Sequence, residues 1–213
     1  MASLTGQSIA SSYEQLLQVD RDGGGNTTTL VDVKDGDGGT TFALKLATDK
    51  IQVNGSIDLT GGQIKFPASQ SASADANTLD DYQIGTFTPV VAEYATPGNA
   101  MSTSSALGSY VKIGDMVTVQ AFVTIDGNGS ATNVAMGVHG LPFTSENVGT
   151  RPGLAIGEQY NLNLASGGSL AGWVLENNTK IYLLEATNTN YSSITRDELS
   201  TNAFFSFSVT YKV

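Results

Sequence analysis

Apolar and polar residues alternate along much of the chain, most clearly in its second half. Every second residue from Val117 to Ile125 is apolar, and the closing run from Phe205 to Val213 repeats this period. Because side chains along a strand point to opposite faces of a sheet, a period of two predicts strands with one buried face. Turn-forming residues at 126–129 and the Asn177-Asn178 pair separate such runs. At the spacing of a β-sandwich or β-barrel, we expect strands near 86–93, 108–125, 133–140, 151–158, 170–176, 179–186 and 203–212.

Shorter alternating runs lie nearer the N-terminus, at 29–33, 41–46, 50–53 and 56–59, separated by Asp-Gly, Asn-Gly and Gly-Gly turns. Strands this short bury too little apolar surface to be stable singly. Pairing of identical chains about a threefold axis would supply the missing surface. We therefore expect a short β stalk whose core contains Leu44, Leu46, Ile51, Val53, Ile57 and Leu59.

Residues 8–17 show the helical spacing of apolar positions, with serines that can cap the N-terminus. A helix of about ten residues is marginal in water, so its apolar side needs a partner. That partner is its own copies, a socket on another protein, or its own domain. The apolar residues that define this side are Ile9, Tyr13, Leu16 and Leu17.

Composition completes the expected organisation. The segment 68–76 is rich in Ser and Ala and has little apolar surface to bury, which is typical of a linker. We expect an N-terminal segment at 1–28, a stalk at 29–66, a linker at 67–84 and a C-terminal domain at 85–213. The predicted fold class is all-β: a short N-terminal helix, a short-stranded trimeric stalk and a C-terminal antiparallel β-sandwich, jelly-roll-like in type.

Charge and cysteine content exclude several functions. The formal net charge is -10 and only 10 residues are Lys or Arg, which argues against nucleic-acid binding and against a basic membrane-binding face. No run of about 18 apolar residues is present, so we expect no membrane insertion. The N-terminus lacks the pattern of a secretory signal, which predicts a protein made in a cytoplasm. Without cysteine, neither disulfides nor thiolate-bound metals stabilise the fold.

Residues that carry chemistry are sparse. His139 is the only histidine, so a His-based triad or a His-rich metal site has few partners, and a structural role is the alternative to a pH-responsive one. The Asp-Gly clusters at 20–26 and 35–39 offer oxygen ligands for calcium, but they lack the EF-hand spacing, and turn formation explains them. We expect no metal and no cofactor.

Paired carboxylates that cleave glycosidic bonds would be the main enzymatic alternative. The sequence places no two at a catalytic separation, and we expect no catalytic residue and no enzyme. The carboxylates considered are Asp80, Asp81, Glu158, Glu176, Glu185, Asp197 and Glu198.

Aromatic residues in polar loops are the remaining candidates for recognition, because exposed rings stack on sugars and dominate protein contacts. Tyr94, Tyr160 and Tyr191 lie beside Pro, Gly, Asn or Thr residues, and we expect them to contact a receptor. Trp173 and Tyr182 lie inside predicted strands, where packing on a sheet is the expected role.

Four stretches resemble bacteriophage fibre proteins. The run from Ile64 to Pro89 contains Ile-Lys-Phe-Pro and Asn-Thr-Leu-Asp-Asp-Tyr-Gln-Ile-Gly-Thr-Phe-Thr-Pro, and it is similar to the junction before their C-terminal domains. Gly108–Val119 resembles their Gly-x-Tyr-x-Lys-Ile-Gly-Asp-x-Val strand, and Gly140–Phe143 resembles a Gly-Leu-Pro-Phe strand end. Leu4–Leu17 is similar to the opening of fibres that plug into a particle.

The resemblance implies a virion protein anchored by its N-terminal helix, assembled in the host cytoplasm and contacting the host surface through its C-terminal domain. Its expected partners are its own copies in a homotrimer, other virion proteins, and a host surface glycan or protein. A capsid decoration or tail adaptor protein with a structural role only is the alternative, and an enzyme acting on surface glycans is a third. The resemblance fits a position on either the tail or the head.

Overall fold

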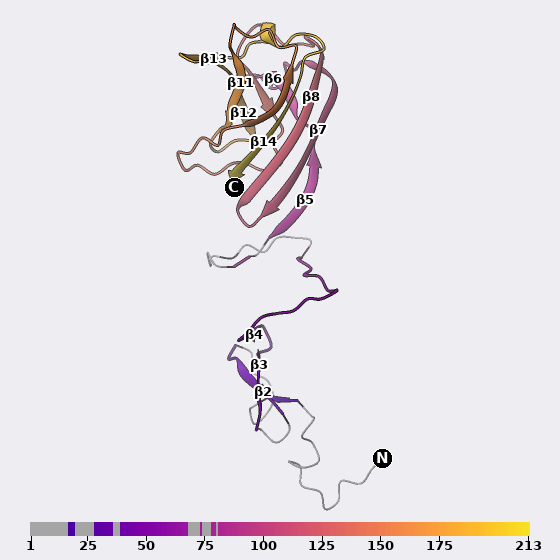
Figure 1. The fold of residues 1–213 in the computed structure, drawn as a ribbon, viewed down its shortest axis with the longest axis vertical. Coiled ribbons are helices and arrows are strands. Elements are labelled where there is room, and N and C mark those ends of the chain that lie inside the picture. Colours follow the sequence, from indigo (N-terminus) through magenta and orange to yellow (C-terminus); the bar gives the residue numbers. More distant parts are fainter. Residues whose placement is uncertain (1–16, 20–27, 36–38, 68–72, 74–77, 80) are drawn as a thin grey trace, which may run out of the picture. The chain divides into compact units, whose positions relative to one another are not determined.

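The structure is a computed structural model that describes residues 17–19, 28–35, 39–67, 73, 78–79 and 81–213 (Figure 1). The chain divides into two compact units, 1–64 and 65–213. The described residues form three antiparallel sheets, and their only helical element is the 3-10 turn η1, Arg196–Glu198. The prediction of an all-β fold is confirmed. None of the described helical residues forms a segment capable of crossing a membrane.

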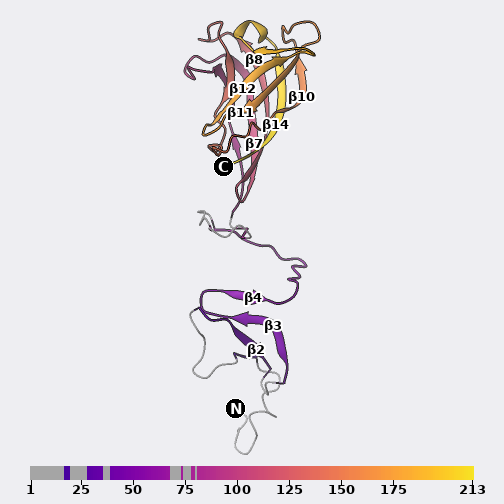
Figure 2. The same ribbon diagram turned by 90° about the vertical axis from the view of Figure 1, so that its left-hand side faces the viewer.

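The described residues of the N-terminal unit form a four-stranded sheet with the order β1-β2-β3-β4, in which each strand pairs with the next in the chain. Figure 2 labels three of these strands, β2, β3 and β4. Lys45 and Asp32 form an ion pair of 2.9 Å across β2 and β3. The expected strand at 56–59 is wrong, because these residues have no ladder partner. The strands are β1 (Gln18–Val19), β2 (Val31–Lys34), β3 (Thr41–Leu46) and β4 (Ile51–Val53).

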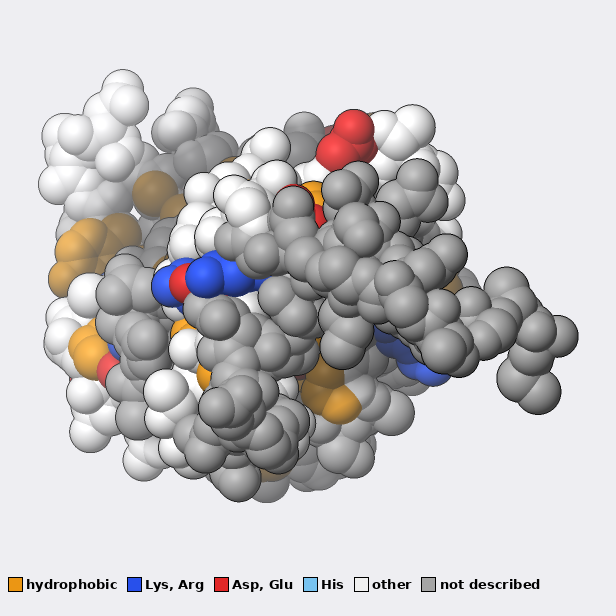
Figure 3. Space-filling model, turned by 90° about the horizontal axis from the view of Figure 1, so that it is seen from below, with side chains coloured by type: hydrophobic (Ala, Val, Ile, Leu, Met, Phe, Trp, Pro, Cys, Tyr) orange, Lys and Arg blue, Asp and Glu red, His pale blue; other side chains and the backbone are white. Residues whose placement is uncertain are grey.

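The residues expected in a stalk core differ in exposure within one chain. Leu44, Leu46 and Val53 are partly buried, whereas Ile51 and Ile57 are 68% and 67% exposed and Leu59 is 43% exposed. Figure 3 shows hydrophobic side chains of the described residues, in orange, at the surface on the face seen from below. Of the expected N-terminal helix, Ile9, Tyr13 and Leu16 lie outside the described residues. Leu17 is exposed and immediately precedes β1.

The C-terminal unit contains two five-stranded sheets, called here the β8 sheet and the β12 sheet. The β8 sheet has the order β10 (Ala155–Tyr160), β14 (Phe204–Lys212), β8 (Met116–Gly127), β7 (Ser102–Ile113) and β5 (Tyr82–Phe87). The β12 sheet has the order β11 (Ser169–Val174), β12 (Lys180–Ala186), β9 (Met136–His139) and β6 (Val90–Glu93), with β13 (Tyr191–Ser193) also paired to β12.

Both sheets bury one face in a single hydrophobic core. Along β8 the burial alternates, and the alternate residues from Val117 to Ile125 are buried, as the period of two predicts. In β14, Phe205 and Tyr211 are almost completely buried, and the β12 sheet contributes Val138, Ile181 and Leu183 to the same cluster. The β8 sheet therefore presents its other face, which includes Leu107, to solvent.

Two of the ranges predicted as single strands each contain residues of two strands in the structure. The range 108–125 contains the end of β7 and most of β8, joined by a tight turn at Gly114-Asp115 in which Gly114 has a φ of +54°. The range 86–93 contains the end of β5 and all of β6, which belong to different sheets and are separated by Thr88-Pro89. In both cases apolar residues continue through the turn, so periodicity alone does not show the break.

Residues of three of the stretches that carry the phage resemblance, those within 64–89, 108–119 and 140–143, meet in the C-terminal unit. Asp81, just before β5, forms a buried ion pair of 2.5 Å with Lys112 of β7, and Lys112 Nζ also donates to the Gly114 carbonyl at 2.7 Å. The Phe143 ring lies edge-on to Tyr110, with centroids 5.2 Å apart, and 5.8 Å from Lys112 Nζ. These contacts fasten β5 to the β7–β8 hairpin.

Two glycines allow β5 and β7 to pack their aromatic rings on each other's backbone. Gly85 pairs with Tyr110 and Gly108 pairs with Phe87. A Cβ atom on Gly85 would lie 2.6 Å from the Tyr110 ring, and one on Gly108 would lie 2.4 Å from the Phe87 ring. Each glycine thus leaves the space that the partner's ring fills, which explains why both motifs combine a glycine with an aromatic residue.

Candidate functional site

A row of three aromatic rings lies on the outer face of the β12 sheet. Trp173 of β11 pairs directly with Tyr182 of β12, and their ring centroids are 5.4 Å apart. Tyr94, which follows β6, meets Tyr182 edge-on at 4.8 Å. Because Val174 and Ile181 beside them point into the core, Trp173 and Tyr182 point outward. Tyr94, Tyr182 and Trp173 are called the aromatic row below.

A cation lies at each end of the aromatic row. The Arg151 guanidinium carbon is 5.0 Å from the Trp173 ring centroid, and Lys180 Nζ is 5.6 Å from that of Tyr94. Lys180 Nζ also donates a hydrogen bond to the Tyr94 carbonyl at 3.3 Å, which fixes its position. Both cations are attracted to the electron-rich ring faces. Tyr182 and Ser193 share a hydroxyl hydrogen bond of 2.5 Å that orients the central ring.

The aromatic row borders a surface cavity of about 440 Å³. Glu176 and Arg151 line the same cavity, so it offers an acceptor and a donor beside apolar ring faces. Ligand pockets commonly combine apolar walls with a few polar groups that set orientation. The cavity residues are Tyr94, Arg151, Trp173, Val174, Leu175, Glu176 and Tyr182.

His139 lies beneath this region and is buried. Its ring Nε2 donates to the Glu93 carbonyl at 3.1 Å, since a carbonyl oxygen only accepts. Burial, with a smaller contribution from the positive charge of Lys180, lowers the pKa of His139. The imidazole is therefore neutral at physiological pH and supports the backbone behind Tyr94.

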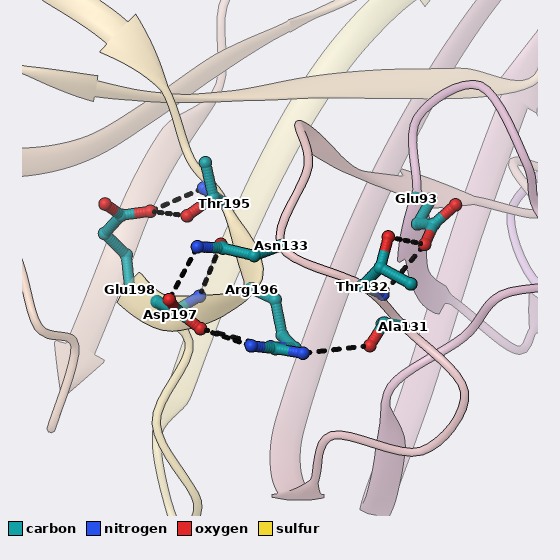
Figure 4. A network of polar contacts seen from close by, with 8 residues as sticks. All are labelled: Glu93, Ala131, Thr132, Asn133, Thr195, Arg196, Asp197 and Glu198. Carbon is teal, nitrogen blue, oxygen red and sulfur yellow. Dashed lines mark hydrogen bonds and ion pairs between the residues drawn. The ribbon is translucent and has the colours of Figure 1, made fainter.

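A polar network at one end of the unit links the loop 128–135 to η1 (Figure 4). The Glu93 carboxylate accepts from the backbone and hydroxyl of Thr132 at 2.8 and 2.7 Å, and these hydrogen bonds lower the pKa of Glu93. Asn133 donates to Asp197 at 2.6 Å, and Asp197 pairs with Arg196 at 2.8 Å. The network positions the loop that leads into β9.

The carboxylates considered from sequence have separate surroundings. Glu198 accepts from the backbone and hydroxyl of Thr195, both at 2.6 Å, and Glu185 is buried and accepts from the Ala165 backbone at 2.5 Å. Asp81 pairs with Lys112, whereas Glu158 is exposed on β10 and Glu176 lines the cavity. Asp80 lies outside the described residues. The described part of the chain contains no group of three or more His, Cys, Asp or Glu residues suited to a metal ion.

The structure separates the three tyrosines expected to contact a receptor. Tyr94 belongs to the aromatic row, Tyr191 is 67% exposed on β13, and Tyr160 is 60% exposed on the β8 sheet, where it stacks on Phe204 at 5.2 Å. Sequence reasoning assigned Trp173 and Tyr182 to packing and did not consider Arg151. Their outward position follows from the alternation with Val174 and Ile181, which was available in the sequence.

Comparison with known proteins gives a likeness of fold. No protein-family model matches the chain, and no curated protein matches it. Among solved structures, the Dettilon tailspike protein (gp208) matches with a TM-score of 0.54 and 16% sequence identity. The match covers 62% of this chain and 24% of the tailspike chain, so it spans about a quarter of that protein. The chain thus shares a domain-sized all-β fold with part of a tailspike protein.

Proposed function

We propose that the chain is a phage virion fibre protein that contacts the host surface through its C-terminal unit. In this proposal its N-terminal residues attach it to the particle, three copies form the fibre, and the C-terminal unit is a jelly-roll-like β-sandwich tip. Support comes from the motifs that resemble those of phage fibres and from the fold likeness to part of a tailspike protein. The tip would be displayed on the virion surface.

The observation that carries the proposal is the aromatic row with its cavity. The apolar face of a sugar ring packs against aromatic side chains, while sugar hydroxyls donate to carboxylates and accept from guanidinium groups. Trp173 and Tyr182 supply the ring faces, Arg151 the donor and Glu176 the acceptor. This combination fits a saccharide of the host envelope better than a nucleic acid, which the chain's acidic charge repels.

Weak single contacts suffice for attachment if several sites engage together. Linked sites turn each further binding event into an intramolecular one, which raises the overall affinity by orders of magnitude. Three tips in a fibre, and several fibres on a particle, would supply that multivalency. The cavity of about 440 Å³ is suited to one or two sugar rings. A ligand this small binds each single site weakly, so the number of sites engaged together decides whether the particle stays attached.

Binding of the full chain to bacterial cells tests this proposal. Fluorescently labelled protein is titrated onto a panel of strains and onto matched mutants that lack surface polysaccharide. We expect Trp173→Ala to weaken binding by about 2 kcal/mol, or roughly 30-fold in Kd, as for a buried aromatic anchor. Tyr160→Ala removes an exposed ring from the other sheet, at a tyrosine that the sequence also predicted as a contact, and it should bind like the wild type if the aromatic row is the contact site.

Equal loss in both variants, or binding that survives Trp173→Ala unchanged, would show that the aromatic row is not the contact site. A protein that binds no strain, but whose absence makes particles fragile, would support the decoration or adaptor role instead. Release of reducing sugar from the bound polysaccharide would point to an enzyme.

A further inference from the structure

The outer face of the β8 sheet is apolar where β5, β7 and β8 lie side by side. It belongs to the other sheet from the one that carries the aromatic row. Register places Tyr82 beside Ile113 and Ile113 beside Met116, and Ile84 lies beside Val111. Figure 1 shows these three strands side by side along one edge of the unit. The exposed fractions are 48% for Tyr82, 64% for Ile84, 67% for Leu107, 38% for Val111, 50% for Ile113 and 46% for Met116.

This face, called the β5–β7–β8 face, has no charged residue between the Ile113–Met116 pair and the Leu107–Phe122 pair. The remaining outward positions there are small or uncharged: Thr86, Ser109, Thr118 and Gln120. Lys112, the charged residue of β7, points inward to Asp81. The face continues into a hollow of about 810 Å³ whose lining includes Leu107, Phe122, Ser206 and Ser208. Because a large exposed apolar patch is typical of an interaction site, we expect this uncharged face to contact a partner.

The area of the face matches an interface between proteins. Its six large apolar side chains expose on the order of 600 Å², taking about 200 Å² for a fully exposed side chain of this size. A single monomer rarely exposes more than about 300–600 Å² in one patch, and a standard interface buries about 800 Å² per partner. The uncharged polar residues between the apolar ones supply the area that separates the apolar surface of the face from that of a standard interface.

We propose that the β5–β7–β8 face docks the same unit of a second copy of this chain. Two copies with a net charge of -10 each repel one another at long range, so contact is favoured where both surfaces carry no charge. A lysine-rich partner would instead require acidic residues on this face. The inference goes beyond the proposed function, because it assigns self-association to the C-terminal unit and does not depend on what the aromatic row binds.

Single cysteines test this inference, since the chain contains none of its own. Ile113→Cys places a thiol on the face, and Val148→Cys is the control, because Val148 has a closely matched exposure of 48% and belongs to the loop between β9 and β10, outside the three strands of the face. Maleimide labelling rates are measured on the full chain beside its mass from light scattering. We expect a mass of several 22.2 kDa protomers and labelling of Ile113→Cys at least tenfold slower than that of Val148→Cys. On dilution to monomers the two rates should converge.

Three outcomes would overturn the inference. Equal labelling rates in an oligomer would place the interface elsewhere. Slow labelling of Ile113→Cys in a 22.2 kDa monomer would mean that another part of the same chain covers the face. A monomer with equal rates at all concentrations would leave the face without a partner copy. A monomer would also remove the three-copy fibre from the proposed function. Binding of cells through the aromatic row is measured separately, so host contact can hold while this inference fails.

Discussion

Removing the positive charge of Lys112 should strongly destabilise the C-terminal unit. Its side chain is 4% exposed, and that of its partner Asp81 is 10% exposed, so the substitution Lys112→Met leaves a carboxylate buried without a counter-ion. Breaking a buried ion pair by removing one partner costs about 3–5 kcal/mol. For a unit of this size, that corresponds to a fall in Tm of roughly 6–20 °C.

The double variant Lys112→Met with Asp81→Leu separates the charge from the packing. Replacing both partners by apolar residues of similar volume is often nearly neutral, because no charge remains buried. We expect it to regain at least about 2 kcal/mol of the loss in the single variant. Measuring Asp81→Leu alone completes a double-mutant cycle, which gives the coupling energy of the pair.

Urea unfolding followed by the fluorescence of Trp173, the only tryptophan, measures these free energies within the C-terminal unit. Protein concentration is kept equal for all variants, since self-association adds to apparent stability. A double variant that is less stable than Lys112→Met alone would refute the reasoning. So would a loss below about 1 kcal/mol in the single variant, which is the value of a solvent-exposed pair.

Three further predictions concern the same unit. Gly85→Ala should cost about 1–3 kcal/mol, because its Cβ would meet the Tyr110 ring, whereas Gly98→Ala, which meets nothing within 4 Å, should change stability by less than about 0.5 kcal/mol in the same urea assay. His139 has a lowered pKa when folded, so its unfolded form gains a proton first as pH falls below 6.5 and stability decreases; His139→Gln should flatten this loss below pH 6.5 in Tm measurements. Burial raises the pKa of Tyr211 to about 12, so Tyr211→Phe should remove one late-ionising phenol from a spectrophotometric titration and, by losing the 3.2 Å bond to the Phe143 carbonyl, about 1 kcal/mol of stability.

Strands with one buried and one polar face were predictable from sequence. β14 alternates Phe, Val and Tyr with Ser and Thr, and its observed bounds differ from the predicted range by one residue at the start. The β7–β8 hairpin was missed because Ile113 and Met116 are apolar although both point outward. A period of two shows which side chains are buried only when the outward side chains are polar, and on the outer face of β7 and β8 they are partly apolar. The Gly-Asp pair at 114–115 was the remaining local signal for the turn.

The candidate site was less predictable than the fold. Alternation places Trp173 and Tyr182 on one face, but it does not say that Tyr94 reaches them. That contact depends on β6 pairing with β9 and β9 with β12, which brings together residues far apart in sequence. Arg151 lies in a loop, where no periodic pattern of apolar residues predicts the direction of a side chain. The expected set Tyr94, Tyr160 and Tyr191 was chosen from loop composition, and composition does not distinguish the two sheets.

The ion pair between Asp81 and Lys112 has a mechanical consequence. Tension that reaches β5, a strand at the edge of its sheet, along the backbone on its N-terminal side passes through Asp81, which directly precedes the strand. Peeling β5 from β7 first requires the separation of two opposite charges in a low-dielectric interior, where their attraction is strongest. The pair thus resists force at the first point of load, ahead of the backbone hydrogen bonds that a pulled edge strand would otherwise lose one at a time.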